Sequence, residues 1–501
     1  MEYIIVQAGG KGTRLQHLTS NKPKALVPIE NLPMIFHLFK KYPEKKYIVI
    51  ADYHKEVLHE YLEVFAKVKY QIVDADGTGT CAGIKEALEL LPEDKSFMLV
   101  WSDLILPDDF ELPIDYEGLQ EPEMNYVGIS QTFPCRWSYI DGQFEEKSTY
   151  EDGVAGLFLF KNKNELSDVP KTGEFVRWMK ETKKKFLKIG LAGTKEFGII
   201  NEFKKVNQER CRPFNKMIIK DDLVIKEGID EQGKKLAIRE CAWYEKAKNF
   251  GIAVLPKIYE TNPLKMEKIH GKNVYEYQIS YEEKKNVLIK LIGSLKKLHN
   301  YESMLVDTFS MREAYYVKTM KRILSVRDLI PFANEQYITI NEKKCRNVFF
   351  YKHELEKKVK QIKCDQFKFI HGDCTFSNLM IRENGDPVLI DPRGYFGFTE
   401  LYGDEQYDWA KLYYSIVGNY DMFNLKKFRL HINENSVNLK IKSNNWEDME
   451  DVFWEETGAN KETIKLLHAI IWLSLTTYAW QDYDSICGAF YNGLYYLEDI
   501  L

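Results

Sequence analysis

Five short apolar runs in the first 200 residues constrain the fold of this chain most. They lie at residues 3–7, 47–51, 70–74, 97–101 and 156–160. Amphipathic stretches with helical spacing, at 32–42 and 82–91, lie between several of them. Such alternation predicts an α/β layer with a Rossmann-like, mostly parallel sheet. Ligands of such sheets bind beyond the carboxyl ends of the strands, so the residues that follow each run are the first candidates for a site.

A chain of 501 residues is longer than one hydrophobic core usually supports, which predicts more than one domain. The polar stretch 204–212 lacks apolar periodicity, and we expect domains at 1–205 and 206–501. In the second region, the residue pattern predicts a β-hairpin at 216–228, a helix at 235–249, a short strand-like segment ending at Gly271 and a mostly helical remainder. We therefore expect an α+β region with a small sheet lobe and a large helical lobe.

Composition excludes several classes of protein. The net charge is −5, with no basic excess, so nucleic acid is not an expected partner. The eight cysteines form no CxxC pair, which favours reduced thiols over a metal site. The most apolar run, 466–480, is too short to span a bilayer, and the N-terminus reads as a strand and not as a signal peptide. We expect a cytoplasmic protein without membrane insertion, and the sequence leaves open whether it forms a homo-oligomer.

A glycine-rich loop, AGGKGTR at residues 8–14, follows the first strand. Glycines let the backbone approach a triphosphate, and successive N–H groups can form an anion-binding nest. Lys11 and Arg14 can neutralise the charge of a departing pyrophosphate, and Lys24 in KPKALVPI can hold an α-phosphate. The predicted nucleotide-binding residues are Ala8, Gly9, Gly10, Lys11, Gly12 and Thr13, with Arg14 and Lys24 as catalytic residues.

These motifs resemble the signature of the sugar-phosphate and phosphocholine nucleotidylyltransferases. The segment GTCAGIKEALELL resembles the part of that family beside the nucleobase, which implies a binding role for Gly79 and Thr80. Asp103, after an apolar strand, stands where the family carries a magnesium-binding aspartate. The family commonly supplies a second such aspartate late in the domain. Here Leu191 occupies that place. Three explanations stay open: the alignment is shifted, another carboxylate such as Asp152 serves, or one metal ion suffices.

A second signature, FIHGDCTFSNLMI, places His371, Asp373 and Asn378 on one loop, and VLIDPRG follows with Asp391. Phosphoryl transfer from ATP needs a carboxylate that accepts the proton of the attacking hydroxyl. It also needs an asparagine and an aspartate that hold magnesium on the phosphates. The spacing of these residues predicts the base-and-metal loop of a small-molecule kinase.

This half resembles the aminoglycoside phosphotransferase and choline kinase family, relatives of the protein kinases. The resemblance implies that Asp373 is the catalytic base and that Asn378 and Asp391 are magnesium ligands. We expect His371 to brace the loop. Asp404 and Asp408 are expected to cap a helix and to brace the same loop.

The resemblance also implies an ATP site upstream. Lys226 stands where the family's strand lysine meets the α- and β-phosphates, and Glu240 is its expected helix partner, with Glu245 as the alternative. Met266, Glu267 and Lys268 form the expected inter-lobe hinge that receives adenine.

The helical lobe is rich in aromatic residues, which can form either a cage for a quaternary ammonium or an ordinary core. They are Trp409, Tyr413, Tyr414, Trp446, Trp454, Trp472, Tyr478, Trp480 and Tyr483. We favour a choline- or ethanolamine-like amino alcohol as the acceptor, with a sugar or polyol as the alternative.

Together the resemblances predict a bifunctional, Mg²⁺-dependent enzyme of surface polysaccharide biosynthesis. The kinase domain would transfer phosphate from ATP to a small-molecule alcohol. The nucleotidyltransferase domain would then join the product to an NTP, with CTP expected, and release pyrophosphate. Two alternatives stay open: a sugar or polyol kinase fused to an enzyme that makes an NDP-sugar, or a protein in which one half is a non-catalytic nucleotide-binding module.

Overall fold

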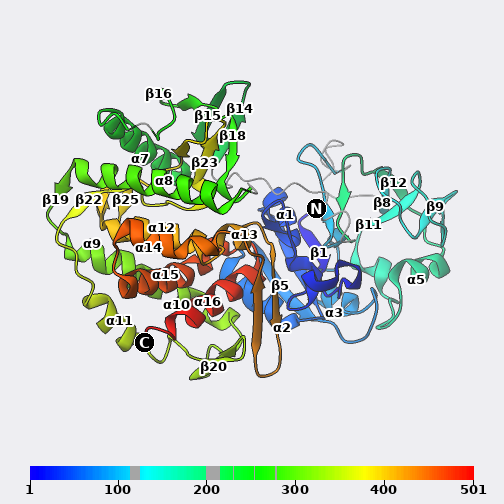
Figure 1. Ribbon diagram of the computed structural model, residues 1–501. Coiled ribbons are helices and arrows are strands. Elements are labelled where there is room, and N and C mark those ends of the chain that lie inside the picture. Colours follow the sequence, from blue (N-terminus) through cyan, green and yellow to red (C-terminus); the bar gives the residue numbers. More distant parts are fainter. Residues whose placement is uncertain (113–123, 199–214, 230, 253, 277–278) are drawn as a thin grey trace. The chain divides into compact units, whose positions relative to one another are not determined.

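The computed structural model describes residues 1–112, 124–198, 215–229, 231–252, 254–276 and 279–501 (Figure 1). The chain divides into two compact units. Unit 1 comprises Met1–Gln208 with Gln481–Tyr483, and unit 2 comprises Glu209–Trp480 with Asp484–Leu501. The expected domain boundary between residues 205 and 206 lies outside the described residues.

Unit 1 is built on a 9-stranded sheet with the order β10-β9-β11-β6-β1-β4-β5, to which β8 and β12 are attached through β11. Its strands are β1 (Tyr3–Gln7), β4 (Lys46–Ala51), β5 (Lys69–Asp74), β6 (Phe97–Trp101), β8 (Tyr126–Ser130), β9 (Ser138–Ile140), β10 (Gln143–Glu145), β11 (Gly153–Phe160) and β12 (Leu187–Gly190). All five predicted runs are strands of this sheet. The central strands β6, β1, β4 and β5 are parallel, as predicted, whereas the fifth run, β11, is antiparallel to β6.

The central strands are apolar because both faces of the sheet are covered. Ile4, Ile5 and Val6 of β1 are fully buried, as is typical of parallel strands between helices. The α-helices in the described part of unit 1 are α1 (Met34–Lys41), α2 (Lys55–Phe65), α3 (Ile84–Glu89) and α5 (Phe175–Thr182). The register pairs Gln7, the last residue of β1, with Ile50 and Trp101 near the ends of β4 and β6. The loops after these three strands therefore meet at one edge of the sheet.

Unit 2 begins with a small antiparallel sheet, order β14-β15-β17-β16, against which helix α7 lies (Figure 1). Its elements are β14 (Asn215–Ile219), β15 (Leu223–Gly228), α7 (Glu231–Lys248), β16 (Ile258–Thr261) and β17 (Leu264–Glu267). The predicted hairpin is formed by β14 and β15, and the predicted helix by α7. Gly271 begins a separate strand, β18 (Gly271–Asn273), which pairs with β23 (Leu379–Arg382), and β23 in turn pairs with β24 (Pro387–Leu389).

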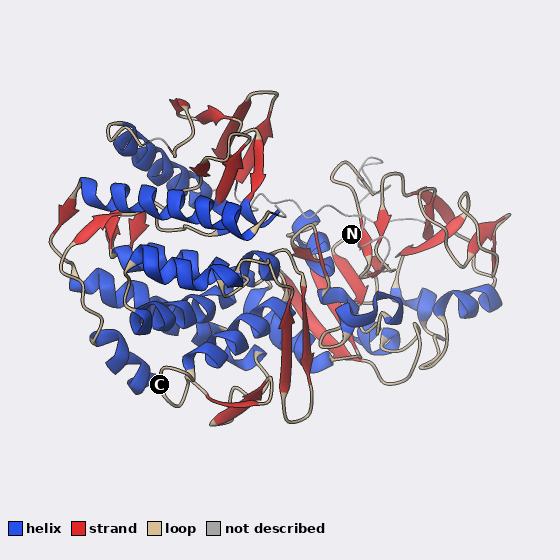
Figure 2. Ribbon diagram, viewed as in Figure 1, coloured by secondary structure: helices blue, strands red, loops and turns tan. Residues whose placement is uncertain are grey.

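The rest of unit 2 holds a group of helices with short sheets between them (Figure 2). The helices are α8 (Tyr281–Tyr301), α9 (Thr308–Arg312), α10 (Lys318–Ser325), α11 (Lys352–Lys360), α12 (Glu405–Ile416), α13 (Tyr420–Asn424), α14 (Glu450–Thr457), α15 (Lys461–Leu475) and α16 (Tyr483–Leu497). Helix α15 covers most of the apolar run 466–480, and α12 and α10 pack against it. No helix among the described residues is both long and apolar enough to cross a bilayer.

The expectation of a mostly helical remainder was wrong in one respect. A second four-stranded sheet, order β21-β20-β29-β28, interrupts the helices. Its strands are β20 (Tyr337–Ile340), β21 (Lys343–Arg346), β28 (Phe428–Ile432) and β29 (Val437–Ile441). In β28, buried Leu430 lies between exposed Arg429 and His431, the alternation of a strand with one covered face. Such short alternating segments carry a weaker signal than the continuous apolar runs of unit 1.

Candidate active sites

The loop after β1 is packed closely against its surroundings, which explains its glycines. Gly12 has a left-handed φ of 61°, and a Cβ atom there would lie 3.1 Å from Cβ of Lys24. A Cβ atom on Gly9 would lie 2.5 Å from Cβ of Asp52, whereas one on Gly10 would meet no atom within 4 Å. The backbone N–H of Lys24 donates to the carbonyl oxygen of Gly10 at 3.3 Å. The loop and Lys24 are therefore one structural element, as their proposed shared role requires.

The loop itself carries two basic side chains. Lys11 Nζ lies 5.4 Å from the centroid of the Tyr53 ring, and Nη2 of Arg14 lies 3.8 Å from Oε1 of Glu196. The Arg14 side chain is 63% exposed, and Thr13 beside it is also exposed. Ala8, in contrast, is buried, and its N–H donates to Ile50 of β4. The loop is anchored at its start and presents positive charge at its end.

Lys24 and Asp103 form an ion pair across 79 positions of the sequence. Asp103 follows β6, and Lys24 begins a short 3-10 turn, η2 (Lys24–Leu26). Both side chains are largely buried. Burial alone would raise the pKa of Asp103, but the Lys24 ammonium outweighs it and lowers the pKa below its usual value. Asp103 is therefore a carboxylate at neutral pH, with Lys24 beside it.

A second carboxylate, Glu196, lies beside Asp103. The short strand β13 (Lys195–Glu196) pairs with β7 (Leu104–Ile105), which places Glu196 opposite Leu104. The N–H of Phe197 donates to the carbonyl oxygen of Asp103 at 3.2 Å. Burial, and then the neighbouring Asp103 carboxylate, raise the pKa of Glu196 to about 7. The sequence analysis did not identify this residue.

Neither residue considered for the second carboxylate lies there. Leu191 is fully buried, and its side chain packs against Gly128 of β8. Asp152 pairs with Lys188 of β12 at 2.7 Å. Glu196, the carboxylate beside Asp103, stands five positions after Leu191 in the same segment, KIGLAGTKEFG.

The segment at Gly79 and Thr80 is fixed to the end of β1. The side-chain amide of Gln7 donates to the carbonyl oxygen of Thr80 at 2.9 Å. The Thr80 hydroxyl accepts a hydrogen bond from the N–H of Phe175 at 2.8 Å. Gly79 has a φ of 84°, and a Cβ atom there would lie 2.3 Å from the carbonyl oxygen of Gly173. The side chain and the carbonyl oxygen of Thr80 are thus both hydrogen-bonded within the protein.

Asp103 and Glu196 suit a magnesium ion by their chemistry. Both offer oxygen atoms, the donors that Mg²⁺ prefers, and a cation between them would relieve the repulsion that raises the pKa of Glu196. No group of three or more His, Cys, Asp or Glu side chains with metal-binding geometry occurs in the described part of the chain. Mg²⁺ usually completes its coordination with water and substrate phosphates, so two carboxylates fit it.

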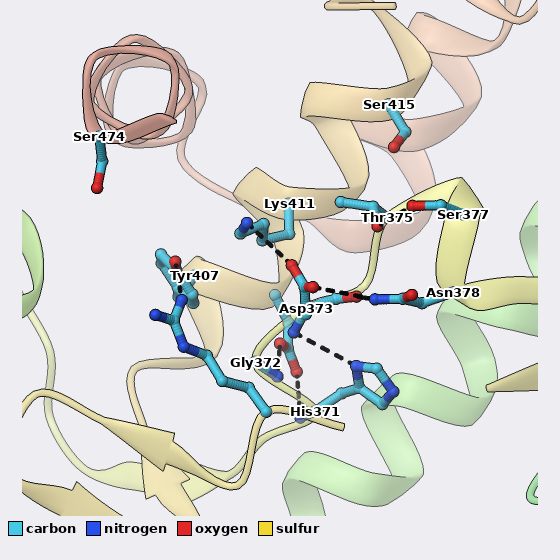
Figure 3. Close-up of polar contacts among 12 residues, drawn as sticks. His371, Gly372, Asp373, Thr375, Ser377, Asn378, Tyr407, Lys411, Ser415 and Ser474 are labelled. Atoms are coloured by element: carbon cyan, nitrogen blue, oxygen red, sulfur yellow. Dashed lines mark hydrogen bonds and ion pairs between the residues drawn. The ribbon is translucent and has the colours of Figure 1, made fainter. Parts of the chain in front are cut away.

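In unit 2, the HGDCTFSN loop holds Asp373 and Asn378 together (Figure 3). The Asn378 amide donates to the Asp373 backbone oxygen at 2.9 Å and to its Oδ2 atom at 3.0 Å. The N–H of Asp373 donates to Nδ1 of His371 at 3.3 Å. Burial lowers the pKa of His371, so the ring is neutral at pH 7 and can accept this hydrogen bond. His371 braces the loop, as expected.

Asp408 supports the same loop from helix α12. Its carboxylate accepts hydrogen bonds from the N–H groups of His371 and Gly372, at 2.9 and 2.6 Å, and from His299 Nε2 at 2.9 Å. Asp404 caps α12 by accepting from the N–H of Gln406 at 3.1 Å. Both aspartates have the structural roles that the sequence indicated.

Lys411 is a residue at this site that the sequence analysis missed. Its Nζ atom lies 2.9 Å from Oδ1 of Asp373, and the Lys411 side chain is 12% exposed. Burial would lower the pKa of Lys411, but the Asp373 carboxylate raises it above its usual value. The ammonium is therefore charged and lies against the carboxylate expected to act as a base. Lys411 stands three positions after Asp408 in α12, on the same face of the helix.

Paired strands bring Asn378 and Asp391 to the same end of a hairpin. Leu379 of β23 is opposite Leu389 of β24, and the N–H of Ile390 donates to the Asn378 carbonyl oxygen at 3.0 Å. Asp391 follows directly, with a left-handed φ of 56°. The two expected magnesium ligands thus leave neighbouring strands at one edge.

Lys226 of β15 lies between two carboxylates. Its Nζ atom is 2.8 Å from Glu240 Oε2 and 2.7 Å from Asp391 Oδ1. Burial would lower the pKa of Lys226, but Asp391 and Glu240 raise it. Glu245 instead accepts a hydrogen bond from Thr261 at 2.9 Å. Glu240, and not Glu245, is therefore the helix partner of Lys226.

The expected hinge follows the small sheet. Met266 is buried in β17 opposite Val224, and the N–H of Lys268 donates to the Asp222 carbonyl oxygen at 3.0 Å. Glu267, between them, forms an ion pair with Arg382 at the end of β23. The ion pair thus connects the end of the small sheet to the β23–β24 hairpin, which follows the HGDCTFSN loop.

Most of the aromatic residues considered for a cation cage are core residues. Seven of the nine are buried: Trp409, Tyr413, Tyr414, Trp446, Trp454, Trp472 and Tyr483. Trp472, for example, is fully buried and donates to His468 at 2.9 Å. The abundance of aromatics in this lobe therefore reflects packing.

Comparison with known proteins identifies the N-terminal region. Residues 3–118 match the family model described as Nucleotidyl transferase. The Bifunctional protein GlmU of Methanococcus maripaludis (strain C5 / ATCC BAA-1333) is 32% identical over 117 residues, which are 23% of this chain and 28% of that protein. The Mannose-1-phosphate guanyltransferase of Yarrowia lipolytica (strain CLIB 122 / E 150) is 29% identical over 145 residues, 27% of this chain and 40% of that protein.

Solved structures also align with this chain. The crystal structure of HddC from Yersinia pseudotuberculosis aligns with 41% of this chain and 98% of its own, at 19% identity and a TM-score of 0.35. The chain spans between about a quarter and two fifths of the length of the curated relatives above. The family match ends at residue 118, before Glu196 and before the whole of unit 2. Residues 3–118 of this chain are therefore similar to the nucleotidyl transferase family.

Proposed function

We propose that this chain is a bifunctional enzyme in which unit 2 phosphorylates a small alcohol and unit 1 transfers a nucleotidyl group to the product. The family match supports the activity of unit 1. One observation carries the kinase proposal: Lys226 bridges Glu240 and Asp391 while Asp373 and Asn378 are hydrogen-bonded on the neighbouring loop. A lysine, its helix glutamate, a base and two magnesium ligands are the parts that phosphoryl transfer from ATP requires.

In the kinase step, Asp373 accepts the proton of the acceptor hydroxyl. The hydroxyl oxygen forms a bond to the γ-phosphorus of ATP as the bond from that phosphorus to the β–γ bridging oxygen breaks, and ADP leaves. Lys226 binds the α- and β-phosphates, and Lys411 keeps Asp373 ionised before the proton arrives. Mg²⁺, held by Asn378 and Asp391, would neutralise charge on the phosphates.

In the nucleotidyl step, a phosphate oxygen of the phosphorylated acceptor attacks the α-phosphorus of the NTP. The bond from that phosphorus to the α–β bridging oxygen breaks, and pyrophosphate leaves. The loop 8–12 binds the triphosphate through backbone N–H groups, Lys24 stabilises charge at the α-phosphate, and Lys11 and Arg14 stabilise the leaving group. Asp103 and Glu196 would hold Mg²⁺. The resemblance to phosphocholine nucleotidylyltransferases favours CTP.

A polyol or sugar acceptor is the second candidate, and one observation favours it over an amino alcohol. Burial of seven of the nine aromatic residues removes most of the argument for a quaternary ammonium cage. The name of one relative, a mannose-1-phosphate guanyltransferase, agrees with a phosphorylated sugar as the substrate of unit 1.

The test is ³¹P NMR on the full chain with ATP and Mg²⁺ and, in turn, amino alcohols, polyols and sugars, followed by addition of each NTP. We expect a phosphomonoester signal with one class of acceptor, and then a diphosphate diester together with pyrophosphate. Formation of the diester from a synthetic phosphomonoester, without any ATP-dependent phosphorylation, would leave unit 1 an enzyme and make unit 2 the non-catalytic alternative.

A further inference from the structure

A group of basic side chains in unit 2, beside Asp373, is not used by the steps described above. We name Lys318, Arg322 and Arg393 the basic cluster. Arg393 donates from Nη1 to the Tyr407 hydroxyl at 2.9 Å and from Nη2 to the Tyr395 hydroxyl at 2.8 Å. Lys318 Nζ lies 5.9 Å from the centroid of the Tyr407 ring. These residues come from α10 and from the segment after β24, so the fold gathers them from distant parts of the sequence.

Arg322 completes the cluster one helical turn after Lys318. Its guanidinium carbon lies 4.5 Å from the centroid of the Tyr478 ring, and Nη1 donates to the carbonyl and hydroxyl oxygens of Ser474, at 2.9 and 2.8 Å. Burial lowers the pKa of Lys318 well below its usual value, and repulsion by Arg393, Arg322 and Lys411 lowers it further. Lys318 and Arg393 both contact Tyr407, one at its ring and the other at its hydroxyl, so these two cationic side chains lie close together.

Among the described residues, no carboxylate forms an ion pair with the cluster, and the Glu313 carboxylate offsets only part of the positive charge at Lys318. In the described part of the chain, no carboxylate oxygen lies within 4.0 Å of a side-chain nitrogen of Lys318, Arg322 or Arg393. The hydrogen-bond acceptors of the two arginines are hydroxyls and a carbonyl, which are neutral. Partly buried charges of one sign cost free energy unless a counter-charge binds. An anion with several oxygen atoms, a carboxylate or a phosphate, supplies this charge and matches the forked donors of arginine.

The cluster adjoins the proposed catalytic base. The N–H of Arg393 donates to the carbonyl oxygen of His371 at 2.8 Å, on the loop that carries Asp373. Lys411 Nζ lies 5.8 Å from the same Tyr407 ring as Lys318 and also contacts Asp373. Figure 3 shows Lys411 and Tyr407 next to Asp373. An anionic group held by the cluster would therefore belong to the molecule whose hydroxyl reaches Asp373.

We propose that the acceptor phosphorylated by unit 2 is an alcohol that carries a carboxylate or a phosphate group, and that Lys318, Arg322 and Arg393 bind this group. The proposal rests on the proposed kinase function, because it names the class of acceptor at that site. It argues against a quaternary ammonium, which these cations would repel, and limits the polyol and sugar alternative to acidic or already phosphorylated compounds.

The test is equilibrium binding to the full chain by calorimetry, with Mg²⁺ and a non-hydrolysable ATP analogue present. The probes are matched sets: glycerol, glycerate and glycerol 3-phosphate; glucose, gluconate and glucose 6-phosphate; and choline. We expect the anionic members of at least one set to bind at least about tenfold more tightly than the neutral member and than choline. The carboxylate and phosphate members distinguish the two kinds of anion.

Substitutions assign the binding to the cluster. Lys318→Gln and Arg322→Gln should each weaken binding of the anionic probe about tenfold or more, and Lys318→Arg should restore most of the affinity. Lys321→Gln is the matched control, because Lys321 is an exposed residue of the same helix. Arg322 also joins α10 to α15 through its hydrogen bond to Ser474. Circular dichroism must therefore confirm that the Arg322→Gln variant is folded. Lys318→Gln tests the proposal independently of this contact.

Equal binding of neutral and anionic probes, absence of binding by every anionic probe, or unchanged affinity in the variants would overturn the proposal. ADP release with the same probes separates it from the kinase function. Rapid phosphorylation of a neutral alcohol or of choline would leave the kinase function intact and overturn the anionic acceptor. Binding of an anionic alcohol at the cluster without ADP release would instead contradict the kinase function.

Discussion

The Nζ atom of Lys411 lies 2.9 Å from the Oδ1 atom of Asp373. This contact gives the carboxylate a permanent positive neighbour in a largely buried position. A base must be ionised before it can accept a proton, and the ammonium favours the ionised form. We predict that Lys411→Met lowers kcat of the kinase about 10- to 100-fold, because Asp373 then titrates at a higher pH. The pH–rate profile should show its acidic limb moved to higher pH.

Lys427 offers a control for charge removal in unit 2, because it is an exposed residue three positions after the end of α13. Lys427→Met should leave the rate and the pH profile unchanged. A Lys411→Met enzyme whose rate falls without any change of the acidic limb would show that Lys411 acts only through packing.

Glu196 is predicted to bind Mg²⁺ together with Asp103. Glu196→Gln removes one charged oxygen ligand, so we expect the apparent affinity for Mg²⁺ in nucleotidyl transfer to fall by about tenfold or more. Asp152→Asn is the matched control, because Asp152 pairs with Lys188 and not with Asp103. Initial rates measured over a Mg²⁺ titration check this. Equal effects of the two substitutions on the apparent Mg²⁺ affinity would show that Glu196 is not a ligand of the metal ion.

In the proposed kinase, Glu240 would hold Lys226 in place for ATP through its ion pair with the Lys226 Nζ atom. Glu240→Gln weakens one of the two ion pairs of Lys226, so we expect the KM for ATP to rise and kcat/KM for ATP to fall about tenfold. Glu245→Gln, on the same helix but bonded to Thr261, should change both values less than about twofold. A larger effect of Glu245→Gln than of Glu240→Gln would contradict the assignment.

Asp421 provides a prediction about stability. It is buried beneath the HGDCTFSN loop, where its Oδ1 atom accepts from the N–H of Ser377 at 2.7 Å, and its Oδ2 atom has no hydrogen-bond partner among the described residues. Burial raises its pKa from 3.8 to about 6. The folded state therefore binds this proton more tightly than the unfolded state, and stability is lost as pH rises from about 4 through about 6.

The size of this effect is about 2–3 kcal/mol for a shift of about two pKa units. Asp421→Asn carries no charge, so its stability relative to the natural protein should improve by about this amount between pH 4 and pH 7.5. Urea unfolding at the two pH values measures it. A difference in stability between the two proteins that does not change with pH would mean that Asp421 is not protonated more readily in the folded state.

Much of unit 1 could be predicted because its signals are local. Runs such as Tyr3–Gln7 and Phe97–Trp101 are continuous and apolar, and a parallel sheet covered on both faces requires such strands. Gly12 and Lys24 lie close together in sequence, so the loop that joins them could be inferred. The direction of β11 could not, since an apolar run looks the same in a parallel and an antiparallel strand.

Glu196 and Lys411 were missed for different physical reasons. Glu196 reaches Asp103 through pairing of the two-residue strands β7 and β13, which are far apart in sequence and too short to show a pattern. Lys411 had a usable signal, because its position one helical turn after Asp408 predicts the same face of α12. The basic cluster depends on the packing of α10 near Arg393, which no local pattern in the sequence reports.

The most direct test of two separate active sites uses Asp103→Asn and Asp373→Asn in parallel, with phosphate products followed by ³¹P NMR. We predict that Asp373→Asn lowers ATP-dependent phosphorylation about 10²- to 10⁴-fold and leaves nucleotidyl transfer to a synthetic phosphomonoester intact. Asp103→Asn should abolish pyrophosphate release and leave phosphorylation intact. Loss of both reactions in either well-folded variant, or of neither in both, would contradict the account.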